Sequence, residues 1–284
     1  MNIQLDYAVP SPALADYVTL FYWFRADVPA FEDVERADHA QLRFRLTPGG
    51  AEYRFADGEA QAVADAHIVG PTTGAFHVKA AGPVEVFGAG ITPAGWAALV
   101  GTDASAAINR ALNVADLFGT TGAGYIIERL RAAPDLAAKT ACCEELMLKA
   151  LGGGQPRTLE FVRIVDAWLS TGASPQIDEL VAATGLSRRQ VERKCRALYG
   201  APPKLLARKY RALRAAVALV ADQVSFDEAI DRGFYDQSHM IREIKQFTGM
   251  TPGQMRDEPG ILAQLTIAHR YALAGRVHPL ISGT

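Results

Sequence analysis

Hydrophobic and polar positions follow two different periods along the chain, and the change falls about a third of the way along it. In the first part, apolar and polar residues alternate in short runs, which is the period of a half-buried β-strand. Leu42 and Phe44 alternate with Arg43 and Arg45, and a proline-glycine turn at 48–50 leads to a second such run, so we expect a β-hairpin here. Further short runs between glycine and proline turns occupy 67–69, 75–79 and 84–92, whereas the acidic stretch 27–38 predicts a loop. This part therefore predicts a small antiparallel β-barrel or sandwich.

From Pro93 onward, apolar positions recur at helical spacing. We expect helices at about 96–100, 104–109, 114–118, 125–132, 136–151, 158–171 and 261–274. The glycine-rich segment 152–156 is typical of a flexible linker. The fold class is therefore α+β, with the β-barrel or sandwich and its following helices in front of an all-α region. The predicted divisions are a sensing or dimerising domain at 1–135, a helical connector at 136–173, a helical domain at 174–258, and a C-terminal helix and tail at 259–284.

Two helix-turn-helix units lie between Ser174 and Arg256. In the first, Gly185 can adopt the left-handed conformation that ends a helix, and Ser187 can cap the next helix. Asp236 has the capping place in the second unit. The second helix of each unit has an apolar inner face, formed by Val191, Cys195 and Leu198 in the first unit and by Met240, Ile244 and Phe247 in the second.

A predicted helix from Pro203 to about Asp222 joins the two units. At 1.5 Å per residue, roughly 19 residues span about 28 Å. Successive major-groove segments on one face of a DNA duplex repeat every ~34 Å. The two second helices could therefore enter successive segments, where arginine suits guanine and glutamine suits adenine.

The run GFYDQSHMIREIKQFTGMTP at 233–252, with the two units and the joining helix in order, resembles the DNA-binding domain of the AraC/XylS family. Val69-Gly70-Pro71 and Thr92-Pro93-Ala94-Gly95 resemble the cupin-like N-terminal regions of some members. The resemblance implies a cytoplasmic, sequence-specific transcription regulator that binds double-stranded DNA and is not an enzyme. Activation is the expected outcome, with repression as the open alternative. RNA polymerase, a small-molecule effector and a second copy of the chain are further candidate partners. The base-reading positions of the family fall on Arg189, Glu192, Arg193, Gln237, Ser238, Ile241 and Arg242.

Charge is distributed unevenly along the chain, although the net charge is only −2. Residues 176–256 hold 14 Lys and Arg against 9 Asp and Glu, a balance of +5, so the rest holds 15 against 22, a balance of −7. The basic region is the one that resembles a DNA binder. Phosphate contacts are expected from Arg188, Arg196, Lys204, Arg208, Lys209 and Lys245.

A ligand pocket in the N-terminal domain is a further expectation, because a small barrel can hold one small molecule. Its candidate residues are Arg43, Arg45, His67, His77 and Trp96. Buried histidines of this kind are more often hydrogen-bonded structural groups, and apolar residues usually take the interior of a barrel. Two alternatives stay open: a ligand-carrying or enzymatic barrel with the helical domain as an accessory, or a front domain that only dimerises.

Several chemistries are disfavoured by the residue spacing. No two histidines are one or three residues apart, so a zinc-type site is not expected. Cys142 and Cys143 precede Glu144 and Glu145, whose charges disfavour a reactive thiolate. The glycines at 152–154 lack the lysine of a phosphate-binding loop. We expect neither metal nor cofactor.

Length and composition fit this organisation. The 284 residues, of which 49% are hydrophobic, can form two cores. Three cysteines predict no disulfide framework. No secretory leader is recognised, and no apolar run approaches the ~20 residues needed to cross a bilayer, so we expect no membrane association.

Overall fold

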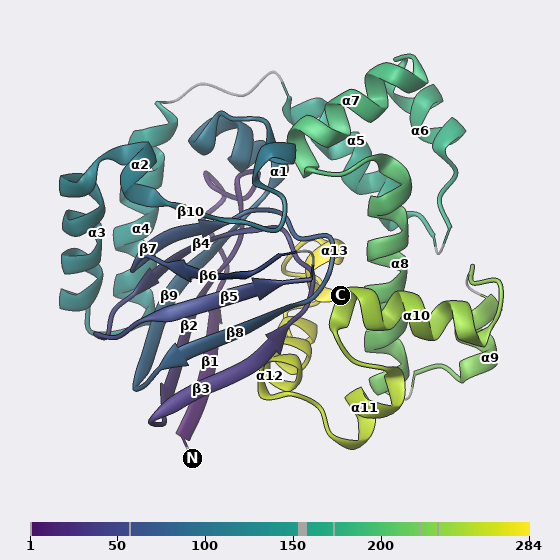
Figure 1. Ribbon diagram of the computed structural model, residues 1–284. Coiled ribbons are helices and arrows are strands. Elements are labelled where there is room, and N and C mark those ends of the chain that lie inside the picture. The colour runs from purple at the N-terminus through teal and green to yellow at the C-terminus, as the bar shows by residue number, and fades with distance from the viewer. Residues whose placement is uncertain (1, 57, 153–157, 173, 222, 232) are drawn as a thin grey trace.

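The computed structural model describes residues 2–56, 58–152, 158–172, 174–221, 223–231 and 233–284 (Figure 1). The predicted glycine-rich linker lies outside these residues except for Gly152. The strands are β1 (Asn2–Ala8), β2 (Val18–Asp27), β3 (Ala30–Glu35), β4 (Ala40–Arg45), β5 (Ala51–Phe55), β6 (Ala60–Val63), β7 (Ala66–Val69), β8 (Phe76–Ala81), β9 (Val84–Ile91) and β10 (Ala111–Asn113). They form a six-stranded sheet in the order β1-β2-β9-β4-β7-β10 and a four-stranded sheet in the order β3-β8-β5-β6. All strand pairs are antiparallel, which confirms the predicted antiparallel sheet domain in its open, two-sheet form.

The predicted hairpin is wrong, because β4 and β5 belong to different sheets. β4 pairs with β9 and β7, and β5 pairs with β8 and β6. The turn between them carries the chain across the sandwich. There the Arg45 side chain donates to the backbone carbonyl oxygens of Thr47 at 3.1 Å, Pro48 at 3.2 Å and Ala81. The predicted loop at 27–38 is also wrong in part, since it contains β3, which forms an edge of the smaller sheet.

The helical elements begin directly after β9. They are α1 (Pro93–Gly95), the π-helix η1 (Trp96–Val100), the 3₁₀-helix η2 (Ala104–Ala107), α2 (Val114–Phe118), α3 (Thr120–Ala132), α4 (Leu136–Leu151), α5 (Leu159–Ser170), α6 (Ile177–Thr184), α7 (Arg188–Tyr199), α8 (Pro203–Val220), α9 (Phe226–Asp231), α10 (Gln237–Thr248), α11 (Pro252–Asp257), α12 (Ile261–Tyr271) and α13 (Pro279–Ser282). In Figure 1, α2, α3 and α4 lie on the opposite side of the sheets from α6 to α10.

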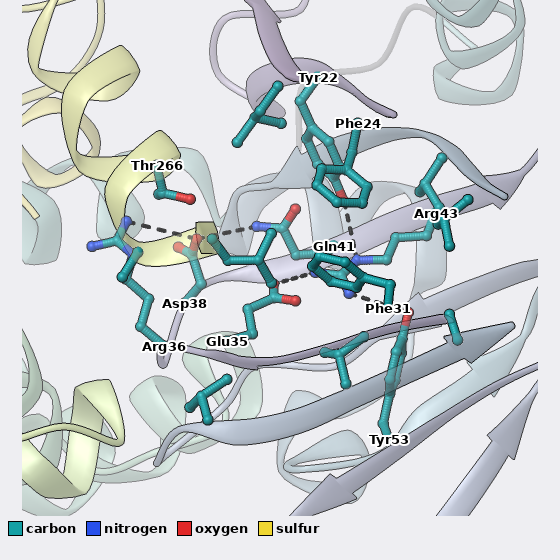
Figure 2. A pocket seen from close by; sticks show the side chains of 18 of the residues that line it. Tyr22, Phe24, Phe31, Glu35, Arg36, Asp38, Gln41, Arg43, Tyr53 and Thr266 are labelled. Atoms are coloured by element: carbon teal, nitrogen blue, oxygen red, sulfur yellow. Dashed lines mark hydrogen bonds and ion pairs between the residues drawn. The ribbon is translucent and has the colours of Figure 1, made fainter. Parts of the chain in front are cut away.

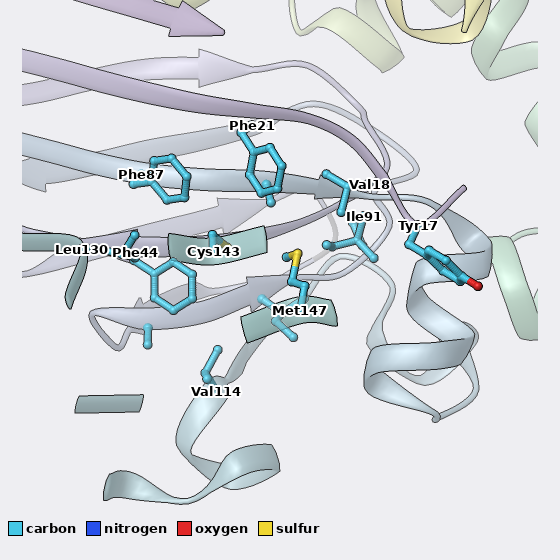
Figure 3. Close-up of a cluster of buried hydrophobic side chains, with 14 of the residues drawn as sticks. Tyr17, Val18, Phe21, Phe44, Phe87, Ile91, Val114, Leu130, Cys143 and Met147 are labelled. Carbon is cyan, nitrogen blue, oxygen red and sulfur yellow. The ribbon is translucent and has the colours of Figure 1, made fainter. Parts of the chain in front are cut away.

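A hydrophobic core lies between the six-stranded sheet and α4 (Figure 3). Phe21, Phe44 and Phe87 of the sheet are fully buried in it, together with Cys143 and Met147 of α4. Each large apolar side chain buried in this way stabilises the fold by about 1.5–3 kcal/mol. Because this layer covers one face of the larger sheet, its other face is turned toward the smaller sheet.

The two helix-turn-helix units fold around α8. In the first unit, the backbone at Gly185 is left-handed, with φ of 65°, and the Ser187 side chain accepts a hydrogen bond from the backbone N–H of Gln190, as predicted. In the second, the Asp236 side chain accepts from the backbone N–H of His239. The inner faces predicted for α7 and α10 are buried, with Cys195 and Phe247 fully enclosed.

The C-terminal helix α12 returns to the sheet domain. The side chain of Asp33, within the edge strand β3, accepts a hydrogen bond from the backbone N–H of Leu262 at 2.8 Å. Leu262 and Leu265 pack with the apolar side chains of β1, β2 and β3. The segment that follows the second helix-turn-helix unit is thus part of the sandwich (Figure 1).

Candidate DNA interface and ligand cavity

The N-terminal parts of α7 and α10 present polar side chains to solvent. Arg189 and Arg193 of α7 are exposed, and Glu192 between them is half-buried. On α10, Gln237, Ser238 and Arg242 are exposed and Ile241 is half-buried. Figure 1 shows α7 near one end of α8 and α10 beside its other half. Both predicted recognition helices therefore have accessible outer faces.

The predicted phosphate-binding residues fall into two groups. Lys204 and Lys245 are exposed. Arg188 pairs with Asp178 at 2.6 Å, and Arg196 approaches Glu192 at 3.5 Å, both on the protein surface. Such exposed pairs contribute about 0–1 kcal/mol and are readily exchanged for other partners. These four residues remain compatible with phosphate contacts.

Arg208 is engaged in a buried network that the sequence did not reveal. The Glu243 side chain of α10 is only 2% exposed and accepts from Arg208 at 2.6 Å and from Arg211 at 2.7 Å, both on α8. His239 lies 3.2 Å from the same carboxylate. Burial alone would raise the pKa of Glu243, but the hydrogen bonds from Arg208 and Arg211 hold that pKa below its usual value. This network sets the position of α10 on α8, so Arg208 has a structural role.

The phosphate contact predicted for Lys209 is corrected by the structure. Lys209 is 5% exposed, and its Nζ donates to the backbone carbonyl oxygens of Asp38 at 2.6 Å and Thr72 at 3.0 Å. Burial lowers the pKa of Lys209 to about 8. Its neighbour Tyr210 forms a 2.8 Å hydrogen bond with Nε2 of His39. These contacts hold the joining helix against the sheet domain.

The C-terminal end of α10 also docks on the sheet domain. The backbone N–H groups of Ala37 and Ala75 donate to the carbonyl oxygens of Phe247 at 2.7 Å and Gln246 at 3.0 Å. Gly249 ends α10 with φ of 80°, and a Cβ there would lie 2.4 Å from Cγ1 of Val34. Glycine is required at this position for both its conformation and its space.

A cavity of about 110 Å³ lies between the two sheets (Figure 2). Phe24, Phe31 and Val84 contribute apolar walls, and Leu213 of α8 and Ile267 of α12 also line it. The cavity is therefore bounded by the sheet domain, the joining helix and the C-terminal helix together.

One polar end of the cavity is a closed network around Arg43. Its Nε donates to the hydroxyl of Tyr22 at 3.0 Å, its Nη1 to the hydroxyl of Tyr53 at 3.2 Å, and its Nη2 to Glu35. His67 lies 2.9 Å from the Tyr53 hydroxyl through Nε2 and 2.7 Å from the Ala64 carbonyl oxygen through Nδ1. Burial, with the nearby Arg43 charge, lowers the pKa of His67 to about 3, so His67 is neutral.

Of the predicted pocket residues, the structure brings Arg43, Arg45 and His67 to the cavity. His77 is exposed on β8 and does not line it. Trp96 is buried in the core beside α4, where its Nε1 donates to the Thr102 carbonyl oxygen at 2.8 Å. The predicted pocket roles of His77 and Trp96 are therefore wrong. The alternation of side chains along β8 turns His77 away from the cavity, and the helical layer buries Trp96 in the core.

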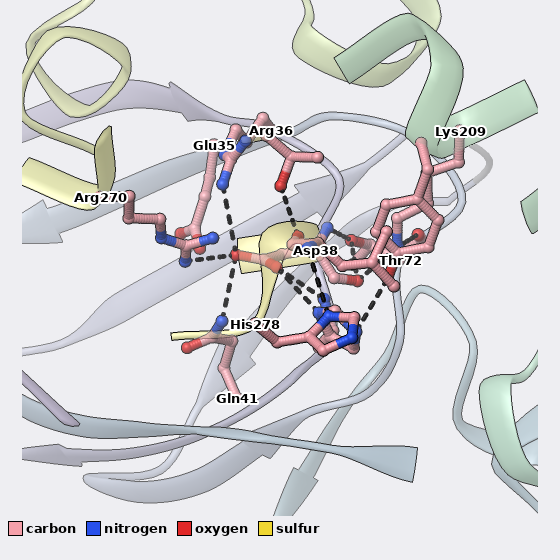
Figure 4. Close-up of polar contacts among 12 residues, drawn as sticks. Glu35, Arg36, Asp38, Gln41, Thr72, Lys209, Arg270 and His278 are labelled. Carbon is pink, nitrogen blue, oxygen red and sulfur yellow. Dashed lines mark hydrogen bonds and ion pairs between the residues drawn. The ribbon is translucent and has the colours of Figure 1, made fainter. Parts of the chain in front are cut away.

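Asp38 forms the other polar end, which sequence reasoning missed (Figure 4). Its Oδ2 accepts from Arg270 of α12 at 2.6 Å and from Gln41 at 3.3 Å, and Arg36 lies 4.0 Å away. Burial would raise the pKa of Asp38, but Arg270, His39 and Arg36 hold it well below the usual value. Asp38 follows β3 in the stretch predicted as a loop, and Arg270 is 232 residues away, so no local pattern indicates the pair.

Neither a metal site nor a membrane span is evident in the part of the chain that the structure describes. No group of three or more His, Cys, Asp and Glu residues there could hold a metal ion. None of the helices described is long and apolar enough to cross a bilayer.

Comparison with known protein families identifies a helix-turn-helix domain within the helical part of the chain. A family model described as a helix-turn-helix domain matches residues 180–258, and a domain of unknown function, DUF6597, matches residues 7–113. No curated protein matches the chain.

Several solved structures share parts of this arrangement at low sequence identity. ToxT from Vibrio cholerae has a TM-score of 0.44 and 8% identity, over 81% of this chain and 98% of that chain. ToxT bound to an unsaturated fatty acid has a TM-score of 0.44 and 8% identity, over 83% and 94%. The AraC-like transcriptional activator CuxR has a TM-score of 0.31 and 13% identity, over 67% and 79%.

The matched helix-turn-helix domain, with both of its second helices exposed, supports a role of this protein as a DNA-binding transcription regulator. Its DNA-binding domain is of the AraC type, which confirms the resemblance seen in the sequence.

Proposed function

We propose that this regulator reads two half-sites in successive major-groove segments, one with α7 and one with α10. The observation that carries the proposal is the placement of two exposed recognition helices along one joining helix. α8 has 18 residues, which corresponds to roughly 27 Å at 1.5 Å per residue. That length is comparable with the ~34 Å repeat of the major groove.

Base reading is assigned to the exposed side chains of the two helices. Arg189 and Arg193, and Arg242 on the second helix, can each donate two hydrogen bonds to guanine, and Gln237 can bind adenine in the same way. Glu192 suits the amino group of cytosine. Ser238 and Ile241 complete the α10 surface. Phosphate contacts are assigned to Arg188, Arg196, Lys204 and Lys245, whereas Arg208 and Lys209 are left out because of their contacts within the protein.

We further propose that residues 1–135 modulate DNA binding by residues 174–258 through an effector in the cavity between the sheets. What supports this is the position of α8, whose residues Leu213, Ala216 and Val217 line that cavity. A bound molecule would contact the helix that carries both recognition helices. Five properties remain predictions from the sequence: activation, contact with RNA polymerase, dimerisation, the cytoplasmic location and the lack of enzymatic activity.

Selection of bound sequences from a random DNA pool tests the half-site assignment. Arg193→Ala should remove base preference in one half-site, and Arg242→Ala should remove it in the other, since each good bidentate contact discriminates by about 1–3 kcal/mol. Arg54→Ala, at an exposed position of β5 in the sheet domain, is the matched control and should preserve both half-sites. Unchanged preferences in both recognition-helix variants would refute the assignment.

The salt dependence of binding tests the phosphate contacts. Each neutralised phosphate contributes about −0.9 to the slope of log affinity against log salt concentration, so four contacts give a slope of about −4. Lys245→Ala should reduce the slope by about one, whereas a slope near zero in the unaltered protein would refute DNA binding by these helices.

A further inference from the structure

The cavity between the sheets is completed by the segment that follows the DNA-binding domain. Leu262, Thr266, Ile267 and Arg270 of α12 all line it. The capping of Leu262 by Asp33 fixes the start of α12 on the sheet edge, so these side chains belong to the cavity wall.

The two polar ends of the cavity differ in how completely they are hydrogen-bonded. At the Arg43 end, each guanidinium nitrogen has a partner, as described above. At the Asp38 end, Nε and Nη2 of Arg36 and Nε and Nη1 of Arg270 are buried and have no hydrogen-bond partner among the described residues. Arg36 is 9% exposed and Arg270 is 7% exposed. Unsatisfied buried donors of charged groups are strongly unfavourable, so this end is chemically incomplete.

The charges at the Asp38 end are also unbalanced. The cations of Arg36, Arg270 and Lys209 surround Asp38, while Glu35 is engaged by Arg43. Burial, with a smaller contribution from repulsion by Arg270, lowers the pKa of Arg36 to about 10. Buried charges are normally paired, and guanidinium groups pair best with planar oxyanions through two parallel hydrogen bonds.

We propose that this cavity binds an amphiphilic carboxylic acid, whose carboxylate is held by Arg36 and Arg270 and whose apolar body lies between the sheets. The proposal rests on the proposed function in that it identifies the chemical class of the effector. Phe24, Phe31 and Val84 supply the apolar surface for the body, and the unpaired guanidinium nitrogens supply donors for the head (Figures 2 and 4). The two guanidinium groups that would hold the head carry two positive charges against the one negative charge of Asp38, so a singly charged head balances them better than a phosphate dianion does.

Calorimetric titration with decanoate below its micellar concentration, and with methyl decanoate below its solubility limit, tests the proposal without DNA. The two probes have the same apolar body, and only the acid carries the anion. We expect the acid to bind at least about tenfold more tightly, since charge-assisted hydrogen bonds to a buried head are lost in the ester. Equal or tighter binding of the ester would overturn the proposal, and so would tighter binding of decyl phosphate than of decanoate.

Variants locate the head group. Arg270→Met and Arg36→Met should each remove most of the preference for the acid, whereas Arg276→Met, at an exposed position beyond α12, should retain it. Arg270→Lys keeps a charge beside Asp38 but loses the planar fork, so it should reduce the preference even if the methionine variant does not fold. A folded Arg270 variant that keeps the full preference would overturn the assignment of the head group.

The outcome for the ligand is separate from the outcome for DNA. Salt-dependent DNA binding with no preference for the acid would reject the ligand class and leave the half-site proposal standing. A preference for the acid without salt-dependent DNA binding would reject the half-site proposal instead.

Discussion

Replacement of Glu243 by glutamine tests whether a buried carboxylate fixes the second recognition helix on α8. Glutamine has nearly the same shape, but it accepts with one oxygen and places an NH₂ group against the other arginine. Each charge-assisted hydrogen bond contributes about 1.5–3 kcal/mol and a neutral one about 0.5–1.5 kcal/mol, so the contact that weakens loses about 1–1.5 kcal/mol and the contact that is broken loses about 1.5–3 kcal/mol. Arg208 is 37% exposed and partly screened by water, so we expect the low end of this sum, a loss of about 2–3 kcal/mol in the free energy of unfolding.

Urea unfolding followed by circular dichroism measures this loss. Glu192→Gln is the matched control, because its partner Arg196 lies at 3.5 Å and the two side chains are 38% and 50% exposed. An exposed pair of this kind contributes less than about 1 kcal/mol. Equal effects of the two substitutions, or a loss below about 0.5 kcal/mol for Glu243→Gln, would refute the idea that Glu243 positions α10.

Three further predictions concern the contacts between the sheet domain and the helical domain, and the cavity. Lys209→Met leaves the buried carbonyl oxygens of Asp38 and Thr72 without their donor, so it should destabilise the protein by about 1–3 kcal/mol. It should also increase backbone hydrogen exchange in residues 36–40. Unchanged exchange in these residues would argue against docking of α8 through Lys209. In Gly249→Ala, the added Cβ would be strained by the φ of 80° and would clash with the side chain of Val34, so the free energy of unfolding should fall by about 1 kcal/mol or more. Adding Val34→Ala to the same chain should restore part of that loss. No loss would mean that the end of α10 does not pack against Val34. The pKa of His67 in the folded protein is lowered to about 3, so below pH 6.5 the unfolded chain binds more protons than the folded protein, and the free energy of unfolding decreases as the pH falls. We expect a loss of about 1.4 kcal/mol between pH 7.5 and pH 5.5. This loss should be absent in His67→Gln and present in the exposed control variant His77→Gln.

The helical domain could be predicted closely because its signals are local. Gly185, Ser187 and Asp236 act on backbone groups within a few residues, so their types and spacing indicate where helices end and begin. The inner faces of α7 and α10 follow from helical periodicity alone. The base-reading assignments remain predictions, because exposure shows that a side chain is accessible and not which base it contacts.

The sheet domain was predicted less well because its pairing is not local. Alternation along β4 predicts one inner and one outer face, but Phe44 packs under α4 while Arg43 faces the cavity, so both faces are covered. The turn after Arg45 has the composition of a hairpin, and only the arginine contacts to Thr47, Pro48 and Ala81 distinguish a crossing between sheets.

Lys209 and Glu243 show a second limit of pattern reasoning. A lysine or a glutamate on a helix is usually solvated, and burial of either requires specific partners. For Lys209 those partners are 171 and 137 residues away along the chain, and for Glu243 they are on the preceding long helix. The basic character of α8 therefore overstates its DNA-facing charge, since four of its five cations, Arg208, Lys209, Arg211 and Arg214, make contacts within the protein.

Asp38 provides a physical connection between the cavity and the DNA-binding domain. Its side chain accepts from Arg270, while its backbone carbonyl oxygen accepts from Lys209 on α8. A ligand held by the unpaired nitrogens of Arg270 would share that guanidinium group with Asp38, so it would act on the residue that holds α8 in place. Because α8 carries both recognition helices, a change there would affect the two half-sites together, whereas a change at the Glu243 network would affect only the half-site read by α10. Coupling between the two domains should therefore be visible in the half-site spacing of the DNA that the protein binds most tightly. This spacing should be measured with and without a ligand in the cavity.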